Sequence, residues 1–442
     1  MMFSRKDLVR LLAPLVVEQI LAVLVGMADV VMVAAVGEAA VSGVSLVDSI
    51  NILIIQLLSA LATGGAVISA QYLGKQKPDQ ACRAAGQLIS ITTLLSVTLT
   101  AFALLLNRQI LSLVFGRVEA EVMRNAEIYF AITAASYPFL ALYNSCAALY
   151  RSMGNSKVSM QVSLLMNAIN VVGNAICVFG LHMGVEGVAY PTLISRMTAG
   201  IIMMALIRMP SNEIRLKSAK DLKPNRKMIE NILAVGIPNG LENSIFQIGK
   251  LTLQSLVSSL GTTALASYAV ASNLVTLQYL PGQAIGLGLI TIVGQCAGAG
   301  EFEQAKSYTK LLIKINYACL LVICAIMVLG SGEIVNIYNL SPAAGEEARM
   351  MMTAHAVAMV IWPIAFTLPN ALRASLDAKF TMLVSVSSMW IFRVGLAYCF
   401  VMAMNMGIMG VWYGMFVDWI FRAILFGFRF KGYGKRKMRQ LA

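Results

Sequence analysis

The feature that most constrains the fold of this chain is a series of long apolar runs. The first, LLAPLVVEQILAVLVGMADVVMVAAVG, extends from Leu11 to Gly37 and contains two acids, Glu18 and Asp29. About 20 apolar residues cross the roughly 30 Å hydrocarbon layer of a bilayer as a helix, because loose backbone groups find no water there. Composition agrees, since 58% of the 442 residues are hydrophobic and 12% are charged. We therefore predict an all-α membrane protein.

Polar breaks between the apolar runs divide the chain into twelve predicted transmembrane spans. They cover roughly residues 9–36, 45–70, 84–106, 128–150, 158–179, 188–207, 231–258, 265–292, 309–329, 351–372, 382–403 and 410–428. A polar insert, Met209–Met228, separates the sixth span from the seventh. The predicted organisation is an N-lobe over 1–207, a basic cytoplasmic linker over 208–230, a C-lobe over 231–430 and a basic cytoplasmic tail over 431–442.

The distribution of Lys and Arg predicts the orientation of these spans. Most basic residues lie in the two terminal segments, the linker and the even-numbered connections, whereas the other loops hold only Arg108, Arg117, Arg124 and Arg349. By the positive-inside rule, both termini are cytoplasmic. The net charge of +13 then reflects topology and contact with anionic lipid headgroups, and not nucleic-acid binding, for which no soluble domain remains. We expect a multi-pass monomer in the plasma membrane.

The two halves of the chain are related in sequence. Placing Pro14 on Pro238 also aligns Glu18 with Glu242, Gly37 with Gly261, Gly64 with Gly288, Gln71 with Gln295, Gly74 with Gly298 and Gln80 with Gln304. Six spans per copy is an even number, so the copies run in the same direction. This predicts two six-helix lobes related by a pseudo-two-fold axis along the membrane normal, an architecture suited to alternating access. The alternative is that duplication only built a larger bundle.

Glu18 and Asp29 are the first candidates for function. A charge in mid-bilayer costs about 2.5 to 17 kcal/mol, so such acids usually face the bundle interior and serve ions or protons. A carboxylate balanced between desolvation and nearby donors can exchange H⁺ for Na⁺ or for a cationic substrate. We select Asp29 as the main candidate and Glu18 as a secondary one. The alternative is an acid that caps or cross-links helices.

Polar residues in the fifth and seventh spans could complete such sites. Asn170 and Asn174 are four residues apart, which places both amides on one helix face, where their oxygens suit a hard cation or a proton donor. They could equally well join helices. Glu242 and Lys250 form a possible polar site in the C-lobe, in which Lys250 either replaces a bound cation or neutralises Glu242.

Three other charged residues are assigned no part in coupling. We expect Arg196, Arg393 and Asp418 to lie nearer the ends of their spans. Long basic side chains near a span end can reach the interface, so we expect locking or snorkelling roles for these residues.

The usual enzyme and metal motifs are missing from the sequence. There is no HExxH, GxSxG or Walker motif, and the seven cysteines include no CxxC pair. We therefore expect neither an enzyme nor a resident cofactor, and no metal beyond a possible Na⁺ at Asp29. An intramembrane enzyme using Glu18, Asp29 and Glu242 stays open as a less favoured alternative.

The chain resembles the multidrug and toxic compound extrusion (MATE) family over essentially its whole length. The resemblance rests on MADVVMVAAVG in the first span, LYRSMGNSK and LRASLDAK after the fourth and tenth, and GVEGVAYPTLIS entering the sixth. It implies an antiporter driven by H⁺ or Na⁺ that exports organic cations or amphipathic drugs. The nearest alternative within transport is a lipid-linked oligosaccharide flippase of related fold, which should place several cations in its cavity.

The resemblance also assigns roles to single residues. In the N-lobe cation site of the family, the aspartate of the first span matches Asp29, two polar residues of the fifth match Asn170 and Asn174, and a threonine of the sixth matches Thr192. Pro14 matches a proline at which the first helix can bend. Some relatives carry an acid at the position of Asn174, and the C-lobe acids of another branch have no counterpart here.

Overall fold

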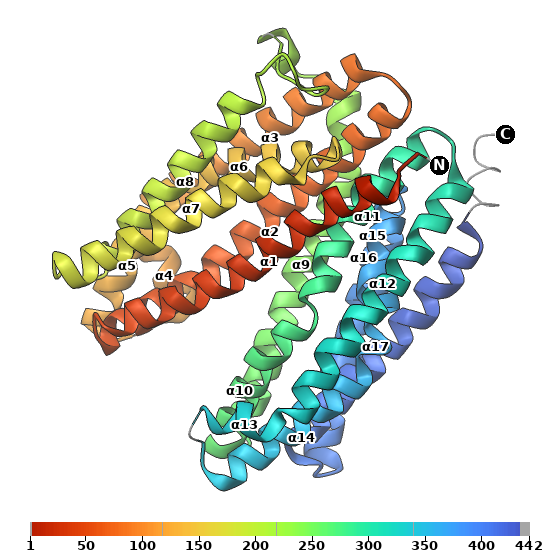
Figure 1. Cartoon of the computed structure of the whole chain (residues 1–442). Coiled ribbons are helices and arrows are strands. Elements are labelled where there is room, and N and C mark those ends of the chain that lie inside the picture. The colour runs from red at the N-terminus through yellow and green to blue at the C-terminus, as the bar shows by residue number, and fades with distance from the viewer. Residues whose placement is uncertain (1, 117, 218, 339, 434–442) are drawn as a thin grey trace. The chain divides into compact units, whose positions relative to one another are not determined.

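The structure is a computed structural model that describes residues 2–116, 118–217, 219–338 and 340–433. All regular secondary structure in these ranges is helical, and these ranges contain no β-strand (Figure 1). The predicted all-α fold is therefore confirmed. Of the predicted basic tail over 431–442, residues 434–442 lie outside the described residues.

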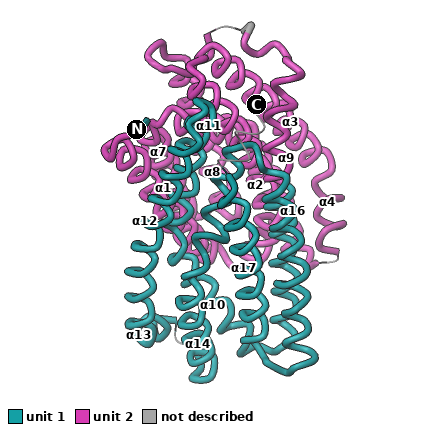
Figure 2. The backbone as a smooth tube through the Cα atoms, turned by 90° about the vertical axis from the view of Figure 1, so that its right-hand side faces the viewer, with its two compact units in different colours: residues 1–2, 241–442 teal, residues 3–240 magenta. Residues whose placement is uncertain are grey.

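The chain packs into two compact units, which Figure 2 shows in different colours. One comprises residues 3–240 and the other residues 1–2 with 241–442. The division therefore falls inside the long helix α9 (Arg226–Ser258), and not in the linker before it. The reason is that the first half of α9 packs against α2 (Glu38–Gly74), where Gly64 approaches the backbone of Ile232 and Gly236.

The unit of residues 3–240 contains α1, α2, the elements that follow them and the first half of α9. Beyond α2, its elements are α1 (Arg5–Ala34), α3 (Pro78–Leu105), α4 (Asn107–Phe115), α5 (Ala120–Ala135), α6 (Tyr137–Ser152), α7 (Ser156–Ala175), the π-helix η1 (Ile176–Gly180), α8 (Glu186–Leu206) and the 3₁₀ helix η2 (Ala219–Leu222). Pro14 lies inside α1, which continues through it.

The second unit begins within α9 and repeats the helical arrangement with more interruptions. Its further elements are α10 (Thr262–Gln278), α11 (Leu280–Gly298), α12 (Phe302–Leu329), α13 (Ser331–Asn336), α14 (Pro342–Ala358), η3 (Pro363–Thr367), α15 (Leu368–Ala374), α16 (Ala378–Ser388), η4 (Met389–Leu396), η5 (Cys399–Ala403) and α17 (Gly407–Lys431). Here η3, η4 and η5 are π-helices.

Ten of the twelve predicted spans have the length and apolarity needed to cross a bilayer. Nine continuous helical segments of the described residues qualify, two of which join an α-helix to π-helical turns (α7 with η1, and α16 with η4 and η5). The bent pair of α14 with η3 and α15 makes a tenth when it is taken as one span. The predicted fourth span consists of α5 and α6, each of 16 residues. The predicted seventh span is α9, whose apolar run is interrupted by Glu242 and Lys250.

Prolines account for the breaks that the apolar runs did not predict. Pro138 and Pro281 stand in the first turn of α6 and α11, directly after breaks at Ser136 and Tyr279. The bent pair turns by 70°, and its π-helical segment begins at Pro363. Because proline lacks an N–H and clashes with the preceding turn, a helix breaks or kinks at that position.

Gly64 allows α2 and α9 to approach each other within the first unit. A Cβ at this position would lie 2.5 Å from the carbonyl oxygen of Ile232 and 2.9 Å from the backbone N of Gly236. Both neighbours are backbone atoms, so no side-chain rotation relieves the contact. The small residues at this crossing thus permit close helix packing, as is common in membrane proteins.

We expect the Gly64→Ala variant to be destabilised by about 1–3 kcal/mol, because an added methyl group in a packed contact forces the backbone apart. The measurement is thermal unfolding of the purified protein in detergent. Gly26→Ala is the control, since a Cβ at Gly26 in α1 meets no atom within 4 Å. Equal melting temperatures for the two variants would contradict the interpretation.

Candidate functional site

A cavity of about 300 Å³ opens within the unit of residues 3–240, between α1, α2, α5, α7 and α8. Its polar lining comprises Ser45, Asp48, Tyr129, Asn167, Asn170, Thr192, Ser195, Arg196 and Asp29. We call it the N-lobe cavity. It contains both a residue selected from the sequence, Asp29, and charged residues that were not selected.

Hydrogen bonds bring the four predicted ion-site residues together in two pairs. The amide of Asn174 in α7 donates to Oδ1 of Asp29 in α1 at 2.8 Å. The amide of Asn170, one helical turn earlier, donates to Oγ1 of Thr192 in α8 at 3.0 Å. Asn170 and Asn174 are both buried, whereas Asp29 is half-buried and faces the cavity. Helices far apart in sequence thus supply one polar cluster.

The orientation of both amides follows from their partners. A carboxylate only accepts, so Asn174 must turn its NH₂ group toward Asp29. The hydroxyl of Thr192 donates to the carbonyl of Val188 at 2.9 Å, so it accepts from Asn170. In consequence, Oδ1 of Asn170 and Oδ1 of Asn174 are buried without a hydrogen-bond partner in the described part of the chain. The cluster therefore contains two hydrogen-bond acceptors that no donor of the described residues satisfies.

Asp48 in α2 is a second acid of this cavity that sequence reasoning missed. Its Oδ1 accepts at 3.3 Å from the hydroxyl of Tyr129 and at 3.3 Å from the amide of Asn51. Asn51 is in turn held by the hydroxyl of Tyr137 at 2.6 Å. The sequence did carry a signal for Asp48, because it lies in the apolar run of the second predicted span, where an acid is as costly as Asp29 is in the first.

Arg196 in α8 lines the same cavity, so the predicted role at a span end does not describe its position. Its Nη1 donates to Oγ of Ser136 at 2.9 Å, and its guanidinium interacts electrostatically with both Asp29 and Asp48. No ion pair within 4 Å joins Arg196 to either acid among the described residues. Asp29 is therefore not locked to an arginine.

Glu18, the secondary candidate, does not line the N-lobe cavity. It forms an ion pair with Arg151 of α6 at 3.7 Å and accepts from the hydroxyls of Ser159 at 3.2 Å and Tyr143 at 3.4 Å. Its carboxylate is thus already held between α1, α6 and α7. This arrangement corresponds to the alternative in which an intramembrane acid cross-links helices.

Glu242 repeats this arrangement in the second unit. Its Oε1 accepts from Nη2 of Arg373 in α15 at 2.6 Å. Glu242 aligns with Glu18 in the sequence repeat, and Arg373 aligns with Arg151. The structure therefore separates Glu242 from Lys250, and the alternative in which Lys250 neutralises Glu242 is replaced by an ion pair with Arg373.

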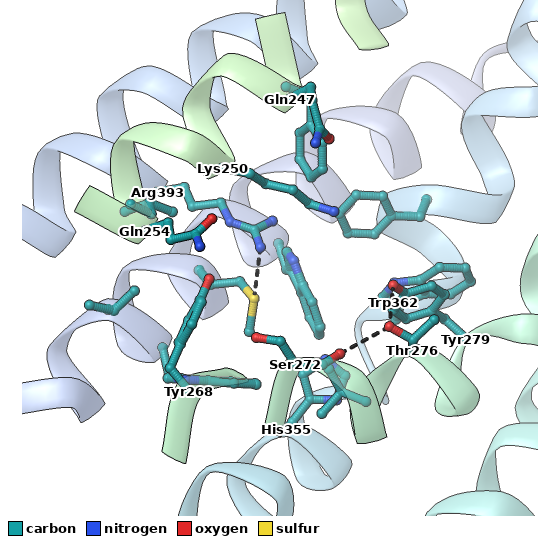
Figure 3. A pocket seen from close by; sticks show the side chains of 18 of the residues that line it. Gln247, Lys250, Gln254, Tyr268, Ser272, Thr276, Tyr279, His355, Trp362 and Arg393 are labelled. Atoms are coloured by element: carbon teal, nitrogen blue, oxygen red, sulfur yellow. Dashed lines mark hydrogen bonds between the residues drawn. The ribbon is translucent and has the colours of Figure 1, made fainter. Parts of the chain in front are cut away.

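Lys250 lines a different cavity of about 420 Å³, which we call the C-lobe cavity (Figure 3). Arg393 of η4 lines it too, so the expected position near a span end was wrong; the residue stands at the middle of the predicted span 382–403. Asp418 of α17 is fully buried beside the cavity and accepts from Nε of Arg422 at 2.7 Å. The predicted locking role fits Asp418, whereas Arg393 belongs to a cavity wall.

Comparison with known proteins identifies the family. The family model described as MatE matches residues 14–176 and 238–399. The chain therefore belongs to the MatE family, whose members are membrane transporters and not enzymes. This excludes the intramembrane-enzyme alternative. The two matched segments coincide with the two sequence copies.

Named relatives span nearly the whole chain. It is 26% identical to the "Uncharacterized transporter YisQ" of Bacillus subtilis, over 93% of this chain and 91% of that protein. It is also 26% identical to the "Probable multidrug resistance protein NorM" of Thermotoga maritima, over 95% and 91%. A solved structure titled "Outward-facing conformation of a multidrug resistance MATE family transporter of the MOP superfamily" has a TM-score of 0.92, 21% identity and coverage of 98% and 96%. The similarity to this solved structure confirms the fold.

Removal of Arg373 should destabilise the second unit strongly, because it leaves the buried Glu242 carboxylate unpaired. We expect Arg373→Met to cost about 3–5 kcal/mol of unfolding free energy, measured by thermal or denaturant unfolding in detergent. Adding Glu242→Gln to this variant should restore much of the loss, since no uncompensated charge then remains. A double variant no more stable than Arg373→Met would refute the ion-pair explanation.

Proposed function

We propose that this protein is a multidrug efflux transporter that exchanges organic cations or amphipathic molecules for H⁺ or Na⁺ by alternating access. Family membership supports export of small molecules, as do relatives named as multidrug resistance proteins, such as NorM of Thermotoga maritima and MepA of Staphylococcus haemolyticus. The proposed coupling site is the cluster around Asp29.

One observation carries the proposed coupling site: an excess of buried acceptors beside a carboxylate. Asp29, Asn170 and Asn174 offer oxygen atoms, two of which have no donor among the described residues. A buried acceptor without a donor costs about 1–3 kcal/mol, so the cluster gains stability when a cation or a proton enters. Carboxylate and amide oxygens are also the ligands that hard cations prefer.

Each residue then has a distinct part in binding the ion. Asp29 supplies the negative charge, and the amide of Asn174 orients its carboxylate. Thr192 holds the amide of Asn170 so that its oxygen stays available. Arg196 limits the negative charge that Asp29 and Asp48 place in the cavity, which weakens cation binding enough to permit release.

Exchange requires that ion and substrate favour different states of the transporter. A ligand shifts a conformational equilibrium only through its difference in affinity between the two states. We propose that H⁺ or Na⁺ at Asp29 stabilises a state with weak substrate affinity. Ion entry on the outside then expels the substrate, and ion release on the inside restores its binding.

The test is transport of a fluorescent organic cation in proteoliposomes under an imposed pH or Na⁺ gradient. We expect Asp29→Asn to abolish gradient-driven flux, because a neutral amide cannot exchange a counter-ion. Asp79→Asn is the matched control, since Asp79 is an exposed acid paired with Lys217 at 2.6 Å outside the cavity. Undiminished flux in Asp29→Asn would rule out this coupling site, and no flux under either gradient would rule out antiport.

A further inference from the structure

We propose that the C-lobe cavity binds organic anions that combine an aromatic body with an acidic group such as a carboxylate. This inference rests on the proposed function, because such anions would be among the exported molecules. It adds a substrate class of opposite charge to the organic cations.

The cavity is lined by two cations and, among the described residues, by no acid. Lys250 is accessible and forms no hydrogen bond or ion pair with the described residues. Arg393 lies 3.9 Å from Asp418, whose Oδ1 is already bonded to Arg422 at 2.7 Å and to the hydroxyl of Ser388. The Asp418 carboxylate is thus shared by the guanidinium groups of Arg393 and Arg422, and no acid of the described residues pairs with Lys250.

Residues that line the C-lobe cavity also carry hydrogen-bond donors without acceptors. The indole N–H groups of Trp412 and Trp419, both lining residues, are buried without an acceptor in the described part of the chain. Nε of Arg393 is likewise buried without one. Each of these groups only donates, so a ligand group that reached one of them would have to accept. Buried donors and an unpaired ammonium together favour an anion.

The wall of the cavity is aromatic. Trp362 stacks on Tyr279, with ring centroids 5.7 Å apart, and on Phe366 at 5.4 Å. Trp419 meets Phe366 edge-on at 5.7 Å. Figure 3 shows Trp362 and Tyr279 on one side of the cavity, and Lys250 and Arg393 on the other. A planar aromatic ligand could extend this series of rings, since aromatic pairs add about 0.5–1.5 kcal/mol beyond area burial.

Phe246 joins the charged side of the cavity to the aromatic side. Nζ of Lys250 lies 5.3 Å and Cζ of Arg393 5.1 Å from the centre of its ring, and Phe366 meets it edge-on at 6.5 Å. The two cations therefore lie within one ligand's reach of the aromatic wall. The volume of about 420 Å³ falls in the range of small-molecule sites.

The sequence repeat shows how the two cavities acquired opposite charge. The position of Asp29 corresponds to Leu253 in the second copy, and that of Asp48 corresponds to Ser272. Both Leu253 and Ser272 line the C-lobe cavity. The acids of the first copy are thus replaced by neutral residues, while Lys250 and Arg393 add positive charge.

The test compares two xanthene dyes of opposite charge in nanodiscs of phosphatidylcholine: fluorescein, an anion at pH 8, and rhodamine 123, a cation. Fluorescence polarisation titrations measure their equilibrium dissociation constants. We expect Lys250→Met to weaken fluorescein binding roughly tenfold or more, the loss of a hydrogen bond to a charged group, without weakening rhodamine 123. Lys250→Arg, which keeps the charge, should retain fluorescein binding.

Competition experiments test the aromatic requirement. We expect 2-naphthoate to displace fluorescein, and inorganic phosphate at the same concentration to displace far less. Equal competition by phosphate would overturn the aromatic part of the proposal. Unchanged fluorescein affinity in Lys250→Met, with an unchanged melting temperature, would overturn the site itself.

A further variant separates this proposal from the coupling mechanism. In an Asp29→Asn background, Lys250→Met should still weaken fluorescein binding by the same factor as in the wild type, because Asp29 does not line the C-lobe cavity and equilibrium binding requires no ion gradient. If gradient-driven flux is absent in the wild type but Lys250 still determines fluorescein binding, the coupling mechanism is wrong and the C-lobe site is supported. If gradient-driven flux is present but fluorescein binding does not depend on Lys250, only the proposal of the C-lobe site is contradicted.

Discussion

A polar atom surrounded by apolar side chains needs a partner, and this requirement governs both units of the protein. Most buried polar groups satisfy it within the chain: Thr133 and Tyr137 bond to Asn51, and Thr92 bonds to Ser145. Among the described residues, the exceptions include Asn170 at the N-lobe cavity and Arg393, Trp412 and Trp419 at the C-lobe cavity, and others, such as Ser69 and Thr93, lie elsewhere. The N-lobe cavity keeps acceptors without donors, and the C-lobe cavity keeps donors without acceptors. An unpaired group in a native structure calls for an explanation, and a ligand of complementary character supplies one.

Duplication explains which features the two units share and where they differ. The ion pair between Glu18 and Arg151 recurs as Glu242 with Arg373, joining corresponding helices in each copy. Its conservation between copies is consistent with a structural role, since one helix is held to another in both. The cavities, in contrast, have diverged in charge. A duplicated scaffold can therefore hold an ion site in one copy and a different binding site in the other.

Part of the site could be predicted from the sequence because it depends on features of a single helix: the spacing of residues on one face and the cost of an acid in an apolar span. Asn170 and Asn174 share a helix face at any tertiary arrangement, and Asp29 is costly in lipid wherever α1 lies. Asp48 obeys the same rule and was overlooked. Arg393 was misplaced in depth, since it stands at the middle of its predicted span. Arg196 was misplaced because depth along a span does not reveal which way a side chain points; both residues line cavities.

The sequence by itself determined the helical membrane fold, the duplicated organisation and the family, because apolar length, charge asymmetry and repeated motifs are properties of the linear chain. Only the tertiary structure decided which polar groups meet. Asp29 meets Asn174 across 145 positions of sequence, and Glu242 meets Arg373 and not its near neighbour Lys250. Pairing of this kind depends on helix packing and rotation, which depend on side chains from many segments at once.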